Sequence, residues 1–537
     1  MSIIIVDALG YGKGKRLATI DVIGCGPRAI AGVLEKYDLN PKIFPANIIL
    51  SKPSILENYK ILFVSAMTQD LTTARKIRIL WNRFSNGPAI IGGPIASDPY
   101  DALIRAGFQI AIIGEGEETL EELLPLLISN DYDPYKLEKI RGIAFKLNSE
   151  LKLNPLRPIM DRDKFRQYKH SVRTIRGYPN YRVARVYVEV VRGCSNYYRT
   201  TIELPDGRKC NNCNLCRTAP LEKRYHCPQG IPPGCGYCSV PSLFGPSRSR
   251  SIEVILDEIE GLIKLGVRRL ILSASDFLDF GRDDLVYPEP LTDPRNPPPN
   301  LDAIEALLNG IKSIITKMRV KVFVGIENVK PCLVNEDAAR LLGKYLYGSP
   351  VHIGCETGSP LHAKMLGRPS SPNETLNAIK LLKKYGLRPY VYFIHGLPGQ
   401  SIETAKETVK IMKKAVALGA EKITVYRFQP LPMSAFGNFS RAPPAYRNPA
   451  SYMIWKTANE INSLLKKELI GKIVEAIITK AHTRRKKLIL AYPFTHGPVI
   501  YLKNHWIAEK FINEIVKVKI TGIISDRAVE GEVIEEL

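Results

Sequence analysis

The sequence predicts an α/β protein built from an N-terminal doubly wound α/β domain, a central partial barrel and a small C-terminal all-β barrel. Three observations predict this. Apolar strands alternate with helical stretches over residues 1–150, and a strand-then-helix unit repeats six times from residue 186. After Gly471, short strand-like runs follow one another without helices. With 537 residues, the chain is too long for a single hydrophobic core.

The N-terminal domain is expected over residues 1–150. Its short apolar runs are separated by helical stretches and by the loops Gly92-Gly93-Pro94 and Gly114-Glu115-Gly116-Glu117. Strand, glycine-rich loop and helix in succession are typical of a doubly wound sheet. We expect strands at Ile3–Val6, Ile61–Ser65, Ala89–Ile91 and Ile110–Ile113.

A basic linker is expected over residues 151–185. The whole chain has a net charge of +23, and residues 151–230 hold 17 Lys and Arg against 6 Asp and Glu. Arginine forks and aromatic faces together suit phosphates and unstacked bases, so this region favours RNA as a partner, although a solvated basic face is the alternative. The interleaved residues are Tyr168, Tyr178, Tyr181, Tyr187, Tyr197 and Tyr198, with Arg166, Arg173, Arg176, Arg182 and Arg199.

The central barrel is expected over residues 186–460. Polar residues that can cap helices (Ser251, Asn373, Ser401) and glycines that can end them (Gly266, Gly386, Gly419) separate its strands. Parallel barrels carry their chemistry at the C-terminal ends of their strands. The expected strands are Val186–Val191, Arg269–Ser273, Lys321–Ile326, Val351–Gly354, Pro389–Ile394 and Lys422–Phe428.

Three cysteines stand out at the end of the first barrel strand. Arg192-Gly193-Cys194 closes a β-branched run, and Cys235-Gly236-Tyr237-Cys238 follows downstream. Two thiols two residues apart plus a third from a nearby loop suit an iron-sulfur cluster with one open iron. Cys227 is the alternative first ligand, and a zinc knuckle is the alternative site for the pair.

These residues resemble the radical S-adenosylmethionine (radical SAM) superfamily, whose three-cysteine loop follows the first barrel strand and often has an aromatic residue before its third cysteine, here Tyr237. The family usually has three residues between its first two cysteines, whereas residues 195–234 form a long insertion here. The resemblance implies that Cys194, Cys235 and Cys238 hold a [4Fe-4S] cluster. It also implies S-adenosylmethionine as cofactor, an external electron donor and a 5′-deoxyadenosyl radical.

The same resemblance implies a set of residues that bind S-adenosylmethionine. The family often has Gly-Gly-Glu after its second strand, and Ser273-Ala274-Ser275-Asp276 takes that place here, with a helix cap as the alternative role of Asp276. Ile353–Ser359 and Lys364–Arg368 resemble the fourth-strand stretch, where a structural ion pair is the alternative. The implied contacts come from Tyr237, Ser275, Asp276, Glu356 and Arg368.

The insertion holds a second cysteine set, Cys210, Cys213, Cys216 and Cys227. The Cys-x-x-Cys-x-x-Cys start and the Cys227-Pro228 end are similar to a ferredoxin cluster motif. This set predicts a second metal site, either another iron-sulfur cluster or a structural zinc. The remaining Cys25, Cys332 and Cys355 are expected to be isolated thiols.

Two further resemblances concern the ends of the chain. The glycine-rich loops of residues 1–150 resemble the N-terminal domain of cobalamin-binding radical enzymes, but no histidine precedes His170 to act as an axial ligand. One interpretation is that this domain binds cobalamin without a protein histidine. The alternative is a domain that only packs against the rest of the protein. Residues 471–537, with Lys517–Gly522 and Val529–Val533, resemble the RNA-binding TRAM domain. Arg484, Arg485, Lys486 and Lys487 would be its basic turn.

Together these features predict a cytoplasmic radical SAM enzyme that modifies tRNA or rRNA by methylthiolation, methylation or a related transfer. No apolar stretch reaches the roughly 20 uncharged residues of a membrane span, and in the reducing cytosol clustered cysteines are metal ligands more often than disulfides. A cobalamin-dependent methyltransferase acting on a small molecule is one alternative. A non-enzymatic iron-sulfur or zinc RNA-binding protein is the other.

Overall fold

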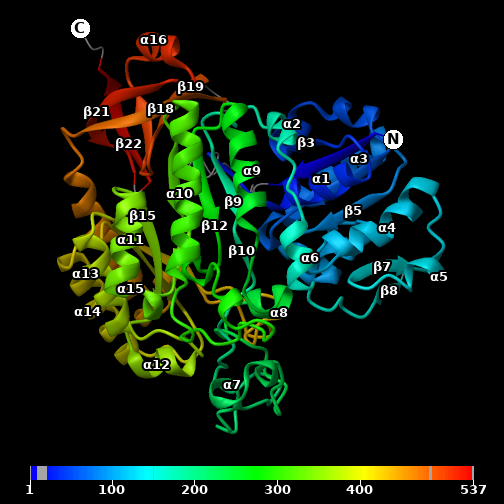
Figure 1. Cartoon of the computed structure of the whole chain (residues 1–537), viewed down its shortest axis with the longest axis horizontal. Coiled ribbons are helices and arrows are strands. Elements are labelled where there is room, and N and C mark those ends of the chain that lie inside the picture. Colours follow the sequence, from blue (N-terminus) through cyan, green and yellow to red (C-terminus); the bar gives the residue numbers. More distant parts are fainter. Residues whose placement is uncertain (1, 9–20, 149, 483–486, 526, 535–537) are drawn as a thin grey trace. The chain divides into compact units, whose positions relative to one another are not determined.

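The computed structural model describes residues 2–8, 21–148, 150–482, 487–525 and 527–534. The chain forms two compact units (Figure 1). Unit 1 consists of residues 1–188 and 250–267, and unit 2 of residues 189–249 and 268–537.

Unit 1 is built around a seven-stranded sheet in the order β3-β1-β4-β5-β6-β7-β8. Its first five strands are parallel, whereas β7 and β8 add an antiparallel hairpin at the edge. The strands are β1 (Ile3–Asp7), β3 (Lys42–Pro45), β4 (Ile61–Ser65), β5 (Ala89–Gly92), β6 (Ile110–Ile112), β7 (Ile143–Leu147) and β8 (Glu150–Leu153). The parallel α/β pattern predicted from the sequence is confirmed.

The helices of unit 1 bury their apolar faces. They are α1 (Gly26–Lys36), α2 (Ala46–Ser51), α3 (Leu71–Phe84), α4 (Glu117–Ser129), α5 (Pro134–Leu137), α6 (Arg162–Gln167) and α9 (Ile252–Lys264). Within unit 1, β2 (Val22–Ile23) pairs in parallel with β9 (Arg185–Glu189). Helix α9 starts at Ser251, whose hydroxyl accepts a hydrogen bond from the Val254 amide, as its sequence predicts.

Unit 2 contains five of the six predicted barrel strands, whereas most of the first, β9, belongs to unit 1. Strands β12 (Arg269–Ser273) and β13 (Phe323–Ile326) pair in parallel. A second parallel sheet has the order β14-β15-β16-β17. Its strands are β14 (Asn328–Val329), β15 (Pro350–Glu356), β16 (Arg388–His395) and β17 (Lys422–Arg427). The predicted repeat of parallel strands and helices is therefore confirmed.

Helices follow these strands along the chain. They are α10 (Leu301–Met318), α11 (Glu336–Leu346), α12 (Pro360–Met365), α13 (Pro372–Lys384), α14 (Ile402–Ala417) and α15 (Pro449–Lys467). Ser401 caps α14 as expected. The expected cap at Asn373 is wrong, because Ser371 caps α13 and forms a capping box with Glu374. Pro372 then occupies the first helical position, where its missing amide hydrogen costs nothing.

The end of unit 2 is a closed five-stranded barrel in the order β18-β19-β20-β22-β21. Its strands are β18 (Ile473–His482), β19 (Lys487–Pro493), β20 (Val499–Leu502), β21 (Ile515–Ile523) and β22 (Ala528–Val533), with α16 (His505–Ala508) between β20 and β21. Alternate residues of these strands, among them Ile478, Ile500 and Val518, form its core. The predicted all-β barrel is confirmed.

Several residues that the sequence favoured for stacking on RNA bases are buried. Tyr178 is fully buried and donates a hydrogen bond to Asp7 over 2.7 Å. Tyr197, Tyr198 and Arg199 are also buried. The expectation that these four side chains form an exposed RNA-binding surface is therefore wrong, because they serve packing. Arg484, Arg485 and Lys486 lie outside the described residues.

None of the helices in the described ranges combines the length and the apolar character needed to cross a membrane.

Candidate active site

The first candidate ligand, Cys194, follows a strand pair that closes the base of the cysteine-rich loop. Strand β10 (Val191–Arg192) pairs antiparallel with β11 (Arg248–Ser249), which brings together the two ends of the loop. Gly193 has φ +82°, and a Cβ there would lie 2.1 Å from the Pro246 carbonyl oxygen. The Cys194 amide then donates to the Gly245 carbonyl over 3.1 Å. Only glycine fits this close approach of two backbones.

Asn196 connects Cys194 with Cys235 across the 40-residue insertion. Its backbone N–H donates to Cys194 Sγ over 3.4 Å, and its side-chain Nδ2 donates to Cys235 Sγ over 3.3 Å. Nδ2 also donates to the Gly367 carbonyl, which fixes the side chain. Two cysteines far apart in the sequence thus accept hydrogen bonds from the backbone and the side chain of one buried residue.

Cys238 completes the group. Burial, together with the neighbouring thiols of Cys235 and Cys194, raises its pKa to about 12. Burial also raises the pKa of Cys194 to about 11, against the opposing effect of the Lys330 ammonium. Buried thiols of this kind ionise when a metal supplies the compensating charge. Three free cysteines and two N–H···S donors fit an iron-sulfur cluster with three protein ligands.

The loop that carries Cys235 and Cys238 leaves no space for a side chain at Gly236. A Cβ there would lie 2.4 Å from Cζ of Phe436. The amide of Phe436 donates to the Gly236 carbonyl over 2.8 Å, and the Gly236 amide donates to the Leu366 carbonyl over 2.8 Å. Segments after β15 and after β17 therefore hold the cysteine pair in place.

A buried network of charges lies beside Cys194, and the sequence pattern did not reveal it. Lys330 Nζ donates to Ser195 Oγ over 2.9 Å, and it pairs with Asp276 over 3.0 Å and with Asp279 over 2.7 Å. Arg282 also pairs with Asp279. Burial lowers the pKa of Lys330, but the two carboxylates more than offset this and raise it overall. Two cations balance two anions, and the network fixes the residue after Cys194.

Asp276 is a structural member of this network. It is fully buried, and its Oδ1 accepts hydrogen bonds from the Leu278 and Lys330 amides while Oδ2 accepts one from Lys330 Nζ. It caps the short turn at Phe277–Asp279, which was the alternative role that the sequence left open. Ser275 is next to it and donates its hydroxyl hydrogen to the Gly193 carbonyl.

Tyr237, Arg368 and Glu356 come together at the end of β15. Arg368 Nη1 donates to the Tyr237 hydroxyl and lies 3.3 Å from Glu356 Oε1, and Nη2 donates to the Gly354 carbonyl over 2.6 Å. Burial raises the pKa of Glu356, although Arg368 opposes this. Glu356 also has φ +66° next to an irregularity in the strand register. A strained backbone at a charged residue is typical of functional sites.

A second acidic residue at the same level of the strands was not predicted. Glu327 directly follows β13 and accepts a hydrogen bond from Ser273 Oγ over 2.7 Å, and burial raises the pKa of its carboxyl. A carboxylic acid just after a buried apolar strand is the signal that could have found it.

Among the described residues, no group of three or more His, Cys, Asp or Glu side chains is arranged around one point to hold a single metal ion. An iron-sulfur cluster places iron and sulfide between its ligands, so its cysteine sulfurs stand farther apart than those around one ion.

A model of the radical SAM superfamily matches residues 225–412. The chain therefore contains a radical SAM domain. Its family cofactors are accordingly a [4Fe-4S] cluster and S-adenosylmethionine. The matched range contains Cys235, Cys238, Glu356 and Arg368, whereas Cys194 lies upstream of it.

Relatives and solved structures extend this picture. The chain is 45% identical, over its full length and 97% of the relative, to the uncharacterized protein MK0932 of Methanopyrus kandleri. It is 24% identical, over 57% of its length and 64% of the relative, to the tRNA-2-methylthio-N(6)-dimethylallyladenosine synthase of a Sulfurihydrogenibium species. Its fold is similar to that of the radical SAM methyltransferase TsrM from Kitasatospora setae with cobalamin and a [4Fe-4S] cluster bound. That match has a TM-score of 0.58 at 15% identity and covers 81% of this chain and 77% of TsrM.

Proposed function

We propose that this radical SAM enzyme modifies tRNA or rRNA, and that Cys194, Cys235 and Cys238 hold its catalytic cluster. The observation that carries the assignment of the ligands is Asn196, whose backbone N–H donates to Cys194 Sγ and whose side-chain Nδ2 donates to Cys235 Sγ. The cluster and S-adenosylmethionine, when bound, supply a 5′-deoxyadenosyl radical. The protein's own residues hold both groups and shield them from water.

Tyr237, Arg368 and Glu356 are the proposed contacts of S-adenosylmethionine. The phenol belongs to the cysteine loop itself, the guanidinium contacts its hydroxyl, and the carboxylate contacts the guanidinium. Aromatic, cationic and anionic groups side by side match an adenine ring and a zwitterionic amino acid. Glu327 and Ser273 are placed at the end of neighbouring strands and are proposed as further polar contacts, while Asp276 has the structural role described above.

RNA as the substrate rests on three supports. The chain has a net charge of +23, which favours binding to phosphates. A distant relative over 57% of the chain bears the name of a tRNA-modifying enzyme. The third support is the closed C-terminal barrel, an architecture that other proteins use to bind nucleic acids.

Two measurements test this proposal separately. Protein purified without oxygen and then reduced should convert S-adenosylmethionine to 5′-deoxyadenosine. The double variant Cys235→Ala/Cys238→Ala should lose this activity, while Cys25→Ala should keep it. Mass spectrometry of RNA nucleosides from a deletion strain should show one modified nucleoside missing and restored by the wild-type gene. An unchanged nucleoside profile would exclude RNA as the substrate but would not contradict the radical chemistry.

A cobalamin-dependent methyltransferase acting on a small molecule is the second candidate. The fold similarity to TsrM covers most of the chain and favours it. Corrinoid absorption in protein purified from cobalamin-fed cells would support this candidate. Absence of both absorption and binding would count against it.

A further inference from the structure

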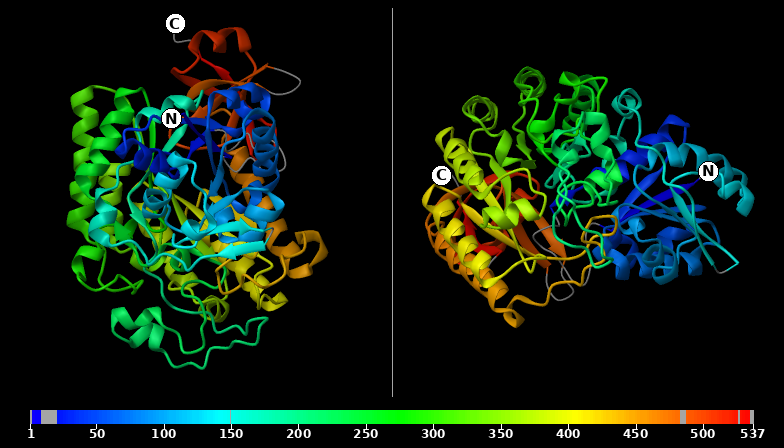
Figure 2. Two further views of the ribbon diagram at one scale, coloured as in Figure 1. Left: turned by 90° about the vertical axis from the view of Figure 1, so that its right-hand side faces the viewer. Right: turned by 90° about the horizontal axis from the view of Figure 1, so that it is seen from below.

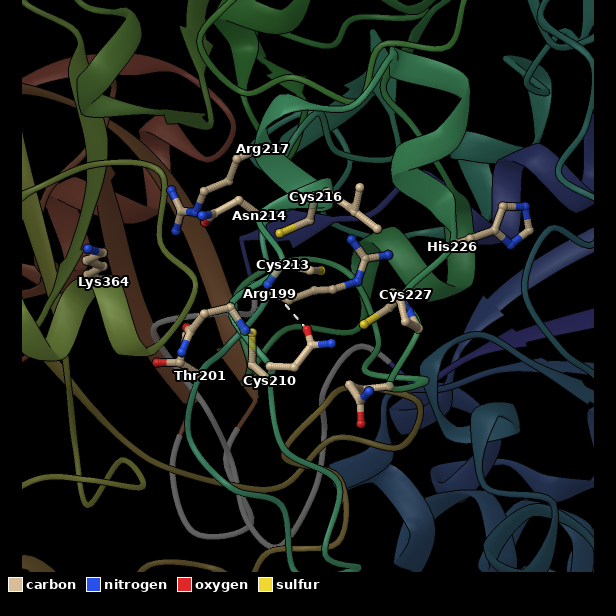
Figure 3. A pocket seen from close by; sticks show the side chains of 15 residues that line it. Arg199, Thr201, Cys210, Cys213, Asn214, Cys216, Arg217, His226, Cys227 and Lys364 are labelled. Atoms are coloured by element: carbon tan, nitrogen blue, oxygen red, sulfur yellow. Dashed lines mark hydrogen bonds between the residues drawn. The ribbon is translucent and has the colours of Figure 1, made fainter.

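The four cysteines of the insertion line one cavity. Figure 3 shows the labelled side chains of Cys210, Cys213, Cys216 and Cys227 around it, and the cavity volume is about 270 Å³. Cys213 is exposed and the other three are half-buried. Figures 1 and 2 show that the short helix α7 (Leu215–Thr218), which carries Cys216, extends away from the barrel strands of unit 2.

The local backbone turns the cysteines toward this cavity. Asn212 and Asn214 both have φ +57°, a left-handed conformation that asparagine tolerates better than most residues. The Asn212 amide donates to Cys210 Sγ over 3.4 Å. Asn196 makes the same bond, from the second residue after the cysteine and over the same distance, to Cys194 at the first site. An N–H···S bond stabilises a thiolate ligand, and its repetition marks the two cysteines as similar in role.

Two arginines, a lysine and a histidine share the cavity with the thiols. Arg199, Arg217, His226 and Lys364 line it beside the four cysteines. Arg217 stacks over the Tyr198 ring at 4.0 Å, and Arg199 donates to the carbonyls of Tyr197, Tyr225 and Ile231. These contacts hold two cations in position. Four thiolates around a metal centre carry net negative charge, and nearby cations offset it.

The second site is a neighbour of the first. Cys210, Cys227 and Tyr237 all pack against one hydrophobic cluster, which includes Leu366 and Phe436. Phe436 is also the side chain that fills the space beside Gly236. A single apolar layer therefore supports both cysteine sets.

We propose that Cys210, Cys213, Cys216 and Cys227 bind a second [4Fe-4S] cluster, in which all four irons have protein ligands, rather than a zinc ion. Zinc draws its four sulfurs to about 3.8 Å from one another, the tetrahedral spacing at a Zn–S distance of about 2.3 Å. A cavity of about 270 Å³ bounded by four cysteines is far larger than one ion fills and suits a cubane of irons and sulfides. With four cysteine ligands the cluster has no open iron, so S-adenosylmethionine binds at the first site alone.

Metal counting on the full chain tests this inference. Wild-type protein purified without oxygen should contain about eight irons and no zinc, since each cubane holds four irons. Native mass spectrometry should show the mass of two clusters. Four irons with one zinc, or four irons with an empty insertion, would overturn the proposal. This measurement needs no variant, so a folding defect cannot obscure it.

Variants then assign each cluster to its cysteines. Cys235→Ala/Cys238→Ala should retain about four irons, and Cys210→Ala/Cys216→Ala should retain about four irons and still bind S-adenosylmethionine. Cys25→Ala is the matched control and should keep about eight. Loss of every iron from the first double variant, in protein with unchanged circular dichroism, would show that the insertion holds no cluster of its own. Failure of the radical reaction with eight irons present would instead contradict only the proposed function.

Discussion

The two cysteine sets differ in what holds them in place. Cys194 follows a strand pair, and a network of Lys330 with the fully buried Arg282, Asp276 and Asp279 fixes the residue next to it. The second set lies within 18 residues of a loop, where turns at Asn212 and Asn214 and the contacts of Arg199 shape the cavity. The first site is thus organised by the fold, whereas we expect the proposed second cluster to supply much of the order of its loop.

Removing the metals should produce the largest difference between the regions around the two cysteine sets. In iron-free protein, backbone amides of residues 205–230 should lose their protection against hydrogen exchange, because few regular hydrogen bonds order this loop. Amides of β12 and β15 should remain protected. Hydrogen exchange with mass spectrometry measures both regions in one experiment. Equal loss of protection in the loop and the strands would abolish the distinction.

Lys330→Met should damage the first site alone. It leaves Asp276 without its cation and Asp279 with Arg282 only, and breaking a buried ion pair costs about 3–5 kcal/mol of unfolding free energy. The variant should lose about four of the eight irons, those of the first cluster. Denaturant unfolding and iron analysis provide the measurements. Lys344→Met is the matched control, because Lys344 forms an exposed pair with Glu305, and exposed pairs contribute little to stability.

Much of the fold follows from the sequence because its signals are local. Apolar runs such as Ile61–Ser65 became the strands expected, and Ser251 and Ser401 cap their helices through their own side chains. The antiparallel hairpin β7–β8 escaped prediction because Glu150–Leu153 is short and half polar. Tertiary packing decides whether such an edge segment becomes a strand.

The site was predictable only in part. Tyr237, Glu356 and Arg368 do meet, since Glu356 ends a barrel strand and the other two lie in loops that follow strands with ends at the same edge. The role of Lys330 could not be foreseen, because a lysine that reaches two aspartates 51 and 54 residues away leaves no pattern in the sequence. The burial of Tyr178, Tyr197 and Tyr198 was also hidden, since spacing alone does not tell a stacking surface from a packed interior.

Acid should destabilise the first region through Asp279. Burial alone would raise the pKa of this carboxyl, but Lys330 and Arg282 lower it to about 2. An aspartate in the unfolded chain has a pKa of about 3.9, so this group stabilises the fold above about pH 4. The contribution of about 2–3 kcal/mol should disappear as the pH falls from about 4 to 2. Unfolding of iron-free protein followed at several pH values should show this loss. In Asp279→Asn the unfolding free energy should depend less steeply on pH, by an amount that corresponds to about one proton. An identical pH dependence in the variant would contradict the assignment.

The smallest expected effect is on the affinity for S-adenosylmethionine rather than on stability, and it distinguishes the two sites. Arg368→Lys removes the fork that contacts both Tyr237 and the Gly354 carbonyl, whereas lysine places a single ammonium there. Affinity for S-adenosylmethionine should fall about tenfold, or about 1.4 kcal/mol, with the iron content unchanged. Equilibrium dialysis of the loaded protein measures this affinity. Arg217→Lys, which lies in the cavity of the second site, is the matched control and should bind S-adenosylmethionine as the wild type does. Equal losses of affinity in both variants would mean that S-adenosylmethionine does not bind only beside Tyr237 and Arg368. The distinction between a first cluster with an open iron and a second cluster without one would then fail.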